Sequence, residues 1–258
     1  MPPKISKFAQ TIQHAAHLIQ GSKHAIVLTG AGISTPSGIP DFRSSGSGLW
    51  QRYDPMEVAS LSAFRYNPEK FFAWLRNLVL QIVQAEPNPA HTSLARLEEA
   101  GKVQAIITQN IDGLHQRAGS KNVLEVHGTM QTLTCIHCYR KYDSSGFIEP
   151  YLENGEIPRC QNCGNILKPD VVLFEEQLPF KIWQSAQAQV NQCDLMIVCG
   201  SSLEVVPVAG LPTQALDHGG SLIIVNETPT YVDEQAEVLI QDDVAEVIPR
   251  IATKVLDE

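Results

Sequence analysis

Long apolar runs and an export signal are both missing from this chain of 258 residues. No stretch approaches the roughly 18 consecutive apolar residues of a membrane-spanning helix, and the longest runs, such as 195–199, have strand length. The segment after Lys4 and Lys7 is interrupted by glutamine and histidine, so it lacks the apolar core of a signal peptide. We therefore expect neither secretion nor a membrane partner, and we predict a cytoplasmic location.

Basic blocks are also missing, because 28 Asp and Glu stand against 19 Lys and Arg, for a net charge of -9. Proteins that bind nucleic-acid phosphates normally show the opposite bias, so we expect no direct nucleic-acid partner. Charged residues make up only 18% of the chain and hydrophobic ones 43%. This composition predicts a folded protein with a substantial core.

Short apolar runs alternate with helical patterns along most of the chain, which predicts a parallel sheet with crossover helices. The runs are continuous rather than alternating, as expected for strands buried on both faces. We therefore predict the α/β class with a doubly wound sheet. The expected strands are 25–28, 103–108, 123–126, 195–199, 222–225 and 238–240, and the clearest helices are 5–20, 68–85, 88–100, 179–191 and 242–256.

Two stretches interrupt this alternation and are interpreted as insertions. Residues 44–87 are rich in loop residues and then show one long helical pattern, whereas 129–169 contain four cysteines and little apolar periodicity. The α/β domain is thus expected to be discontinuous, made of 1–43, 88–128 and 170–258.

The four cysteines of the second insertion form two C-x2-C pairs, Cys135 with Cys138 and Cys160 with Cys163, with 21 residues between the pairs. Each pair presents two thiolates, and two pairs complete a tetrahedral Zn²⁺ site. Without an export signal, metal ligands are favoured over disulfides. Four protein ligands leave no open position, so we predict one structural zinc ion; the alternative is a pair of redox dithiols.

A glycine-rich turn, Gly30-Ala31-Gly32, follows the first predicted strand and is typical of turns that bring backbone N–H groups to a phosphate. The third glycine of the dinucleotide fingerprint is replaced by Thr35, and the acidic residue expected about 20 residues further on is absent. An ordinary nicotinamide-dependent dehydrogenase is therefore disfavoured. A plain strand-to-helix turn without a ligand is the alternative.

Polar side chains follow two further predicted strands. Gln109, Asn110 and Asp112 come after the strand at 103–108, and His127 follows the next strand. Because ligand crevices form at the carboxyl ends of parallel strands, we expect these groups to converge. The amides can bind a ribose or an amide, and the histidine can act as a base near neutral pH.

Together these motifs resemble the sirtuins, the NAD-dependent protein-lysine deacylases, in their compact prokaryotic form. The matching segments, in chain order, are 30–34, 38–43, 108–112, 127–128, the two C-x2-C pairs, 168–174, 200–207 and 225–226. The resemblance implies a Rossmann-like domain with a small zinc-ribbon module at 129–169. It also implies a cofactor loop and helical module at 44–87, and we expect a monomer.

Carried onto this chain, the resemblance implies NAD as co-substrate, with His127 and Asn110 as catalytic residues. Acyl-lysine peptides are the implied partners, added as a strand between 171–174 and 202–206. The implied NAD contacts are Gly30, Ala31, Gly32, Ser34, Thr35, Asp41, Phe42, Arg43, Gln109, Asn110, Ile111, Asp112, His127, Gly200, Ser201, Ser202, Asn226, Glu227, Asp243 and Val244. The implied substrate contacts are Val171, Val172, Leu173, Phe174, Leu203, Glu204 and Val205.

The implied reaction removes an acyl group, most simply acetyl, from a protein lysine. The acyl oxygen attacks the ribose carbon as nicotinamide leaves, which gives an alkylimidate. His127 deprotonates a ribose hydroxyl, which then attacks the imidate carbon, and hydrolysis gives free lysine and O-acyl-ADP-ribose. Two alternatives remain open. The same pocket suits an NAD glycohydrolase or mono-ADP-ribosyltransferase, and it also suits a non-catalytic module that binds NAD or ADP-ribose.

Two departures from the family pattern concern the substrate. Glu175 replaces a usual glycine, which is either a tolerated surface substitution or a cause of altered substrate preference; a positive φ there would strain glutamate. Family members that prefer succinyl or malonyl groups carry a Tyr-x-x-Arg pair, where this chain has Leu75 and Leu78. Acetyl or longer apolar acyl groups are therefore expected.

Overall fold

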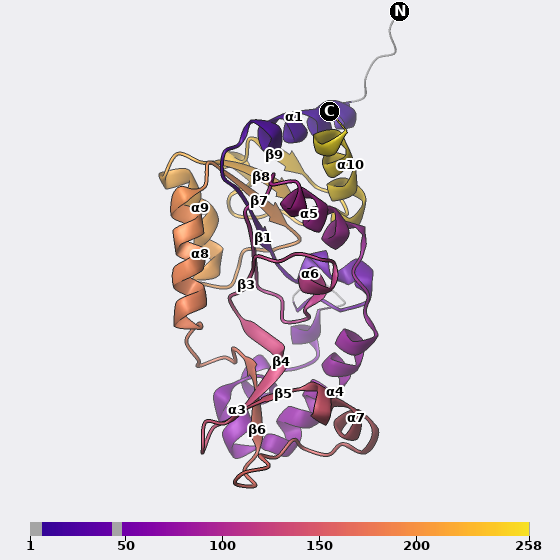
Figure 1. Cartoon of the computed structure of the whole chain (residues 1–258), viewed down its shortest axis with the longest axis vertical. Helices are drawn as coiled ribbons and strands as arrows, with labels where there is room; N and C mark the ends of the chain where they lie inside the picture. Colours follow the sequence, from indigo (N-terminus) through magenta and orange to yellow (C-terminus); the bar gives the residue numbers. More distant parts are fainter. Residues whose placement is uncertain (1–6, 43–47, 258) are drawn as a thin grey trace, which may run out of the picture.

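A six-stranded parallel sheet forms the centre of the computed structural model, which describes residues 7–42 and 48–257 (Figure 1). The strand order is β3-β2-β1-β7-β8-β9. The chain builds outward from β1 to β3 and then returns to β7 beside β1, so the sheet is doubly wound, as predicted. Its strands are β1 (Ala25–Thr29), β2 (Ala105–Thr108), β3 (Val123–Glu125), β7 (Leu195–Cys199), β8 (Ser221–Val225) and β9 (Val238–Ile240).

Helices cover both faces of this sheet and bury alternate residues of each strand. Val27 of β1 joins the core under α1, α5 and α10, whereas its neighbours Ile26 and Leu28 join the core under α8 and α9. In Figure 1, α8 and α9 lie to the left of the sheet and α5 and α10 to its right. The helices are α1 (Lys7–Gly21), α5 (Pro89–Glu99), α8 (Phe180–Gln192), α9 (Leu211–Asp217) and α10 (Val244–Leu256).

A second, antiparallel sheet of order β5-β4-β6 lies at the far end of the molecule from α1 (Figure 1). It carries the cysteine pairs and one helix between its strands. The sequence predicted a cysteine module here but not its strands or its helix, because the segment has little periodicity. Its elements are β4 (Gly128–Cys135), β5 (Lys141–Asp143), β6 (Leu167–Val171) and α7 (Ser145–Asn154).

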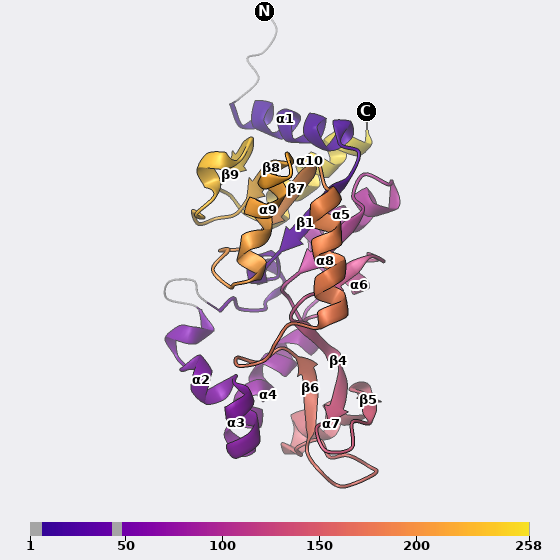
Figure 2. The same cartoon turned by 90° about the vertical axis from the view of Figure 1, so that its left-hand side faces the viewer.

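A helical insertion packs against this second sheet (Figure 2). It contains α2 (Pro55–Val58), α3 (Leu61–Tyr66) and α4 (Pro68–Gln84), the last within the predicted range 68–85. Phe64, Phe71 and Phe72 meet edge to face in its core. Arg76 on α4 donates through Nε to the Leu152 carbonyl at 3.0 Å, which joins α4 to α7.

Short elements are where the prediction and the structure differ most. The sequence did not predict α6 (Leu114–Arg117) or α9, because a helix of one or two turns shows little periodicity.

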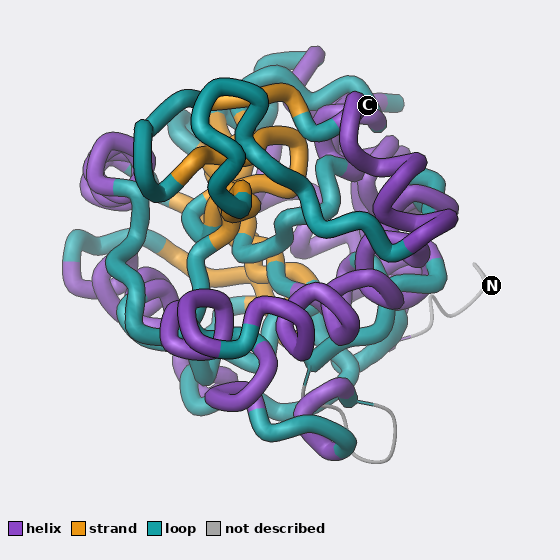
Figure 3. Tube along the Cα trace, turned by 90° about the horizontal axis from the view of Figure 1, so that it is seen from below, coloured by secondary structure: helices purple, strands orange, loops and turns teal. Residues whose placement is uncertain are grey.

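Seen from below, helices surround the strands (Figure 3). Within residues 7–42 and 48–257, no helix combines the length and apolarity needed to cross a membrane. Single 3₁₀ turns occur at Ala31–Ile33, Thr35–Ser37, Leu49–Gln51, Val208–Gly210 and Asp233–Gln235.

Candidate functional site

A cleft of about 330 Å³ opens at the carboxyl ends of the central strands, where the sequence predicted a crevice. Loops after β1, β2, β7 and β8 supply its walls, and His127 follows β3. The predicted NAD contacts that line it are Gly30, Ala31, Gly32, Thr35, Asp41, Phe42, Gln109, Asn110, His127, Gly200, Ser201, Ser202, Asn226, Glu227, Asp243 and Val244. Glu204 and Val205, predicted as substrate contacts, line the same cleft.

Some predicted contacts lie elsewhere, and two lining residues were not predicted. Ile111 and Asp112 line a separate cavity, whereas Arg43 lies outside the described residues. Thr228 and Pro229 line the cleft beside Asn226, whose Nδ2 donates to the Thr228 carbonyl at 2.6 Å. The motif match at 225–226 predicted that the loop after β8 contacts the ligand. Nothing in the sequence indicated that the residues after Glu227 also line the cleft.

Gly32 and Gly200 bring the loops after β1 and β7 into contact. The Gly32 N–H donates to the Gly200 carbonyl at 2.8 Å. A Cβ on Gly32 would lie 2.9 Å from that oxygen, and one on Gly200, whose φ is +60°, would lie 2.2 Å from the Ile33 nitrogen. Both positions thus require glycine because backbone packs closely on backbone here, a reason that was not predicted from the sequence. The prediction that the turn Gly30-Ala31-Gly32 brings N–H groups to a phosphate stays a prediction.

Asn110 is held at the cleft wall by its side-chain amide. Its Nδ2 donates to the Gly30 carbonyl at 3.0 Å and to Ser34 Oγ at 3.1 Å, and Ser34 in turn donates to Asp112 Oδ2 at 2.7 Å. Ser34, only 1% exposed, thus links two residues that face different cavities. Burial raises the pKa of Asp112, although hydrogen bonds from the Leu114 N–H and Ser34 oppose this shift.

His127 is oriented by the backbone of the neighbouring strand end. Its Nδ1 lies 3.1 Å from the Gln109 carbonyl oxygen. Because a carbonyl only accepts hydrogen bonds, the proton of the neutral ring sits on Nδ1 and the lone pair on Nε2. This is the tautomer that can remove a proton from a group bound in the cleft.

The polar side chains of the cleft suit a dinucleotide, a molecule with many hydroxyl and amide groups. Asn110, Ser201 and Asn226 are each less than 10% exposed and bring amide and hydroxyl groups into the wall. Gln109 Nε2 donates to Ser201 Oγ at 2.9 Å, which joins the loops after β2 and β7. NAD therefore fits the donors and acceptors present.

A second, apolar cavity of about 210 Å³ lies between α4 and the cysteine-bearing sheet. Its wall includes Leu75 and Val79 of α4, Met130 of β4, and Ile111 beside the first cleft. A succinyl or malonyl group would need charged or polar partners at positions 75 and 78. These positions hold Leu75 and Leu78, which are buried among apolar residues. Both side chains are apolar, so neither of these two positions offers a charged partner to a carboxylated acyl chain.

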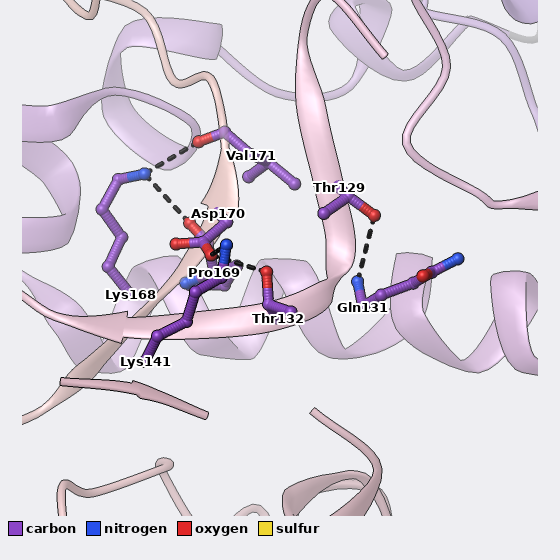
Figure 4. A network of polar contacts seen from close by, with 8 residues as sticks. All are labelled: Thr129, Gln131, Thr132, Lys141, Lys168, Pro169, Asp170 and Val171. Atoms are coloured by element: carbon purple, nitrogen blue, oxygen red, sulfur yellow. Dashed lines mark hydrogen bonds and ion pairs between the residues drawn. The ribbon is translucent and has the colours of Figure 1, made fainter. Parts of the chain in front are cut away.

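The segment 171–174, expected to pair with a peptide, already has much of its backbone engaged, and Figure 4 shows the contact of Lys168 with its first carbonyl, that of Val171. Buried Lys168 donates through Nζ to the carbonyls of Pro169 and Val171 at 2.9 and 2.8 Å, and forms an ion pair with Glu176 at 2.9 Å. The same Glu176 carboxylate accepts the Leu173 N–H at 3.0 Å. The Lys168–Glu176 pair therefore fixes the shape of this edge before any peptide arrives.

Glu175 adopts a backbone conformation that favours glycine, with φ at +73°. Its carboxylate compensates by accepting the Ser62 N–H at 2.8 Å and the Ser62 hydroxyl at 3.1 Å. Ser62 is in the first turn of α3, where backbone N–H groups have no partner within the helix. Glutamate at this position thus links the segment 171–174 to the helical insertion.

We expect two substitutions of Glu175 to separate its backbone strain from its side-chain contacts. Glu175→Ala keeps the left-handed conformation and loses both hydrogen bonds, so its free energy of unfolding should fall by about 1–2 kcal/mol. Glu175→Gly loses the same bonds but relieves about 1 kcal/mol of strain, so it should be the more stable variant. Urea unfolding measures both. Equal stability of the two variants would contradict this account.

The four cysteines of the second sheet converge as predicted. Their sulfur atoms all lie within 4.8 Å of one another, with Cys135–Cys163 and Cys138–Cys160 each at 3.5 Å. Thiolates about 2.3 Å from a tetrahedral zinc ion lie about 3.8 Å apart, so the donor set fits Zn²⁺. Tyr142 Oη lies 3.2 Å from Cys160 Sγ and can donate to that thiolate.

Comparison with known proteins identifies the family. The model of the Sir2 family matches residues 30–207. The chain is 49% identical to NAD-dependent protein deacylase 2 of Archaeoglobus fulgidus, covering 95% of this chain and 96% of that protein.

Two solved structures share the fold over nearly the whole chain. A Sir2–p53 peptide–NAD⁺ structure has a TM-score of 0.85 at 41% identity, covering 93% of this chain and 96% of that one. Sir2Af2 bound to a myristoylated histone peptide has a TM-score of 0.82 at 43% identity, covering 95% and 96%. With the cleft, the cysteine cluster and these matches in agreement, the chain belongs to the Sir2 family, the sirtuins.

Proposed function

We propose that this protein removes acyl groups, most simply acetyl, from protein lysines at the expense of NAD. The main support for this proposal is the geometry of His127. This side chain lines the polar cleft, and the Gln109 carbonyl fixes its proton on Nδ1. The names of its relatives support NAD-dependent deacylation. A structure with NAD⁺ and a peptide, at 41% identity, supports the same substrates.

In this proposal each group of the cleft has a defined task. NAD, when bound, supplies the ribose carbon that accepts the acyl oxygen and the nicotinamide that leaves. Asn110, fixed by Gly30 and Ser34, orients the nicotinamide end. His127 Nε2 removes a proton from a ribose hydroxyl. Asn226, Glu227 and Asp243 are assigned to the adenosine end.

Nicotinamide release by the purified protein, with and without an acetyl-lysine peptide, tests this function. Release that requires the peptide, with O-acetyl-ADP-ribose formed in equal amount, is the expected result. Release without peptide would instead establish a glycohydrolase or transferase. Binding of NAD without any release would establish the non-catalytic module.

The apolar cavity extends the proposal to longer acyl chains. It shares Ile111 with the loop that carries Asn110, so a chain leaving the catalytic cleft has an apolar space beside it. A relative at 43% identity binds a myristoylated peptide, which supports this use of the fold. We therefore assign this cavity to the apolar part of a long acyl group.

A bulkier side chain in the cavity should reduce the turnover of long-chain acyl-lysine peptides but not that of acetyl-lysine peptides. Val79→Phe on α4 adds bulk inside the cavity, so turnover of a myristoyl-lysine peptide should fall at least tenfold while acetyl turnover stays within about twofold. Leu80→Phe is the matched control, because Leu80 is 42% exposed on the same helix and does not line the cavity. An equal loss for both acyl groups in Val79→Phe would overturn the assignment.

The finer sequence predictions fit this function. We assign 1–43, 88–128 and 170–258 to the NAD-binding domain, 44–87 to the cofactor loop and helical module, and 129–169 to the zinc module. The assignment of 171–174 and 203–205 to the peptide is supported by the position of Glu204 and Val205 at the cleft. A cytoplasmic location, a monomeric state and the absence of nucleic-acid partners stay predictions.

A further inference from the structure

Two buried histidines lie behind the catalytic cleft without lining it. His91 on α5 and His115 on α6 are 0% and 1% exposed, and their ring centroids are 4.9 Å apart. Burial lowers the pKa of His91 to about 4. Burial, together with repulsion from His91, lowers the pKa of His115 to about 3. Both rings are therefore neutral near pH 7, and each carries one proton whose position can be deduced from its neighbours.

The proton of His91 is placed by the start of α5. The backbone N–H of Asn88 donates to His91 Nδ1 at 3.4 Å, as part of a capping box. Because Nδ1 accepts, the proton of the neutral ring lies on Nε2. His91 Nε2 is buried and has no hydrogen-bond partner among the described residues.

The proton of His115 is placed by two threonines at the sheet. Thr29 donates its hydroxyl hydrogen to Thr108 Oγ1 at 2.8 Å, so toward His115 Nε2, 3.0 Å away, the Thr29 oxygen acts as an acceptor. His115 consequently has its proton on Nε2 and its lone pair on Nδ1. That Nδ1 is likewise buried without a partner among the described residues.

The two unpartnered atoms are complementary, since His91 presents an N–H and His115 a lone pair. Beyond the rings, His115 donates to Thr29 and Thr29 donates to Thr108 Oγ1. Thr108 Oγ1 also accepts the backbone N–H of Asn110 at 3.0 Å. The chain of contacts thus ends at the residue assigned to the nicotinamide end of the cleft.

We propose that His115 is a positioning residue: by donating from Nε2 to Thr29 it orders Thr29 and Thr108 and so fixes the backbone of Asn110. The side-chain amide of Asn110 is held from the opposite side by Gly30 and Ser34. Without the ordered threonines, the Asn110 N–H would lose its hydrogen bond to Thr108 Oγ1, and this side of the Asn110 backbone would be held less firmly. This inference rests on the proposed NAD-dependent function.

Replacing His115 by amides of two lengths tests the role, because glutamine places its N–H near the position of Nε2 and asparagine near that of Nδ1. His115→Leu and His115→Asn should raise the KM for NAD about tenfold while kcat and the KM for the peptide change less than threefold. His115→Gln should restore the KM for NAD to within about threefold of the unaltered protein. Equal KM values for the Gln and Leu variants would overturn the proposal.

Nitrogen-15 NMR of histidine-labelled protein gives a readout that does not need activity. Both His91 and His115 should be neutral Nε2–H tautomers at pH 7, and an Nδ1–H tautomer on His115 would overturn the proposal. Calorimetric NAD binding by the same variants should follow the order of the KM values. If the unaltered protein binds NAD without turnover, the proposed deacylase function is wrong. The positioning role of His115 is still tested in that case, by the two tautomers and by the order of NAD affinities among the variants.

Discussion

His127→Ala should lower the turnover of an acetyl-lysine peptide by about 10³-fold or more, because a general base of this kind contributes about 10²–10⁴-fold to the rate. The affinity for NAD should change by less than about threefold, since many other side chains line the cleft. Initial rates from nicotinamide release, together with calorimetric NAD binding, measure both quantities on the same preparation.

The matched control is His17→Ala, which removes an exposed histidine on α1 that does not line the cleft. This variant should retain full turnover. Full turnover in His127→Ala would refute the role of His127 as a base. A large loss of NAD affinity in His127→Ala would show instead that the ring mainly holds the cofactor.

Loss of the zinc site should have the largest effect on stability. The second sheet has a small apolar core, formed mainly by Leu133, Leu167 and the buried cysteines themselves. Structural zinc contributes a large share of the folding free energy in such modules. Cys160→Ser should therefore abolish stoichiometric zinc and lower the free energy of unfolding by about 3 kcal/mol or more. Metal analysis and thermal unfolding, with and without a chelator, measure these effects.

Cys193→Ser provides the control, because Cys193 is buried but belongs to the other end of the molecule, against α8 and the central sheet. It should retain one zinc ion per chain, and its unfolding should remain sensitive to the chelator. A Cys160→Ser variant that kept one tightly bound zinc ion would contradict a four-cysteine site.

The strands of the central sheet could be predicted because both of their faces are buried. The run 195–199 is apolar at every position and coincides with β7. The cysteine site could also be predicted, because its spacing alone specifies a tetrahedral donor set. The strands that carry those cysteines could not, since Thr and polar residues alternate there with few apolar positions.

Contacts between distant parts of the chain could not be predicted from the sequence. Glu175 and Ser62 are 113 positions apart, so nothing near Glu175 indicated why glutamate is tolerated at a positive φ. Ile111 and Asp112 follow Asn110 directly, yet they line a different cavity. Spacing places residues in one loop, whereas the direction of each side chain depends on packing that only the folded chain defines. The contact between the rings of His91 and His115, 24 positions apart, likewise could not be predicted from spacing.

The buried histidine pair also makes one contribution to the acid sensitivity of the fold. In the unfolded chain both imidazoles bind a proton below about pH 6.5, whereas in the folded protein they stay neutral down to about pH 4. The unfolded state therefore binds up to two more protons than the folded state in this interval, and each of them lowers the free energy of unfolding by about 1.4 kcal/mol for every unit by which the pH falls. Protonation of this pair by mild acid thus weakens the fold at residues that are linked through Thr29 and Thr108 to Asn110.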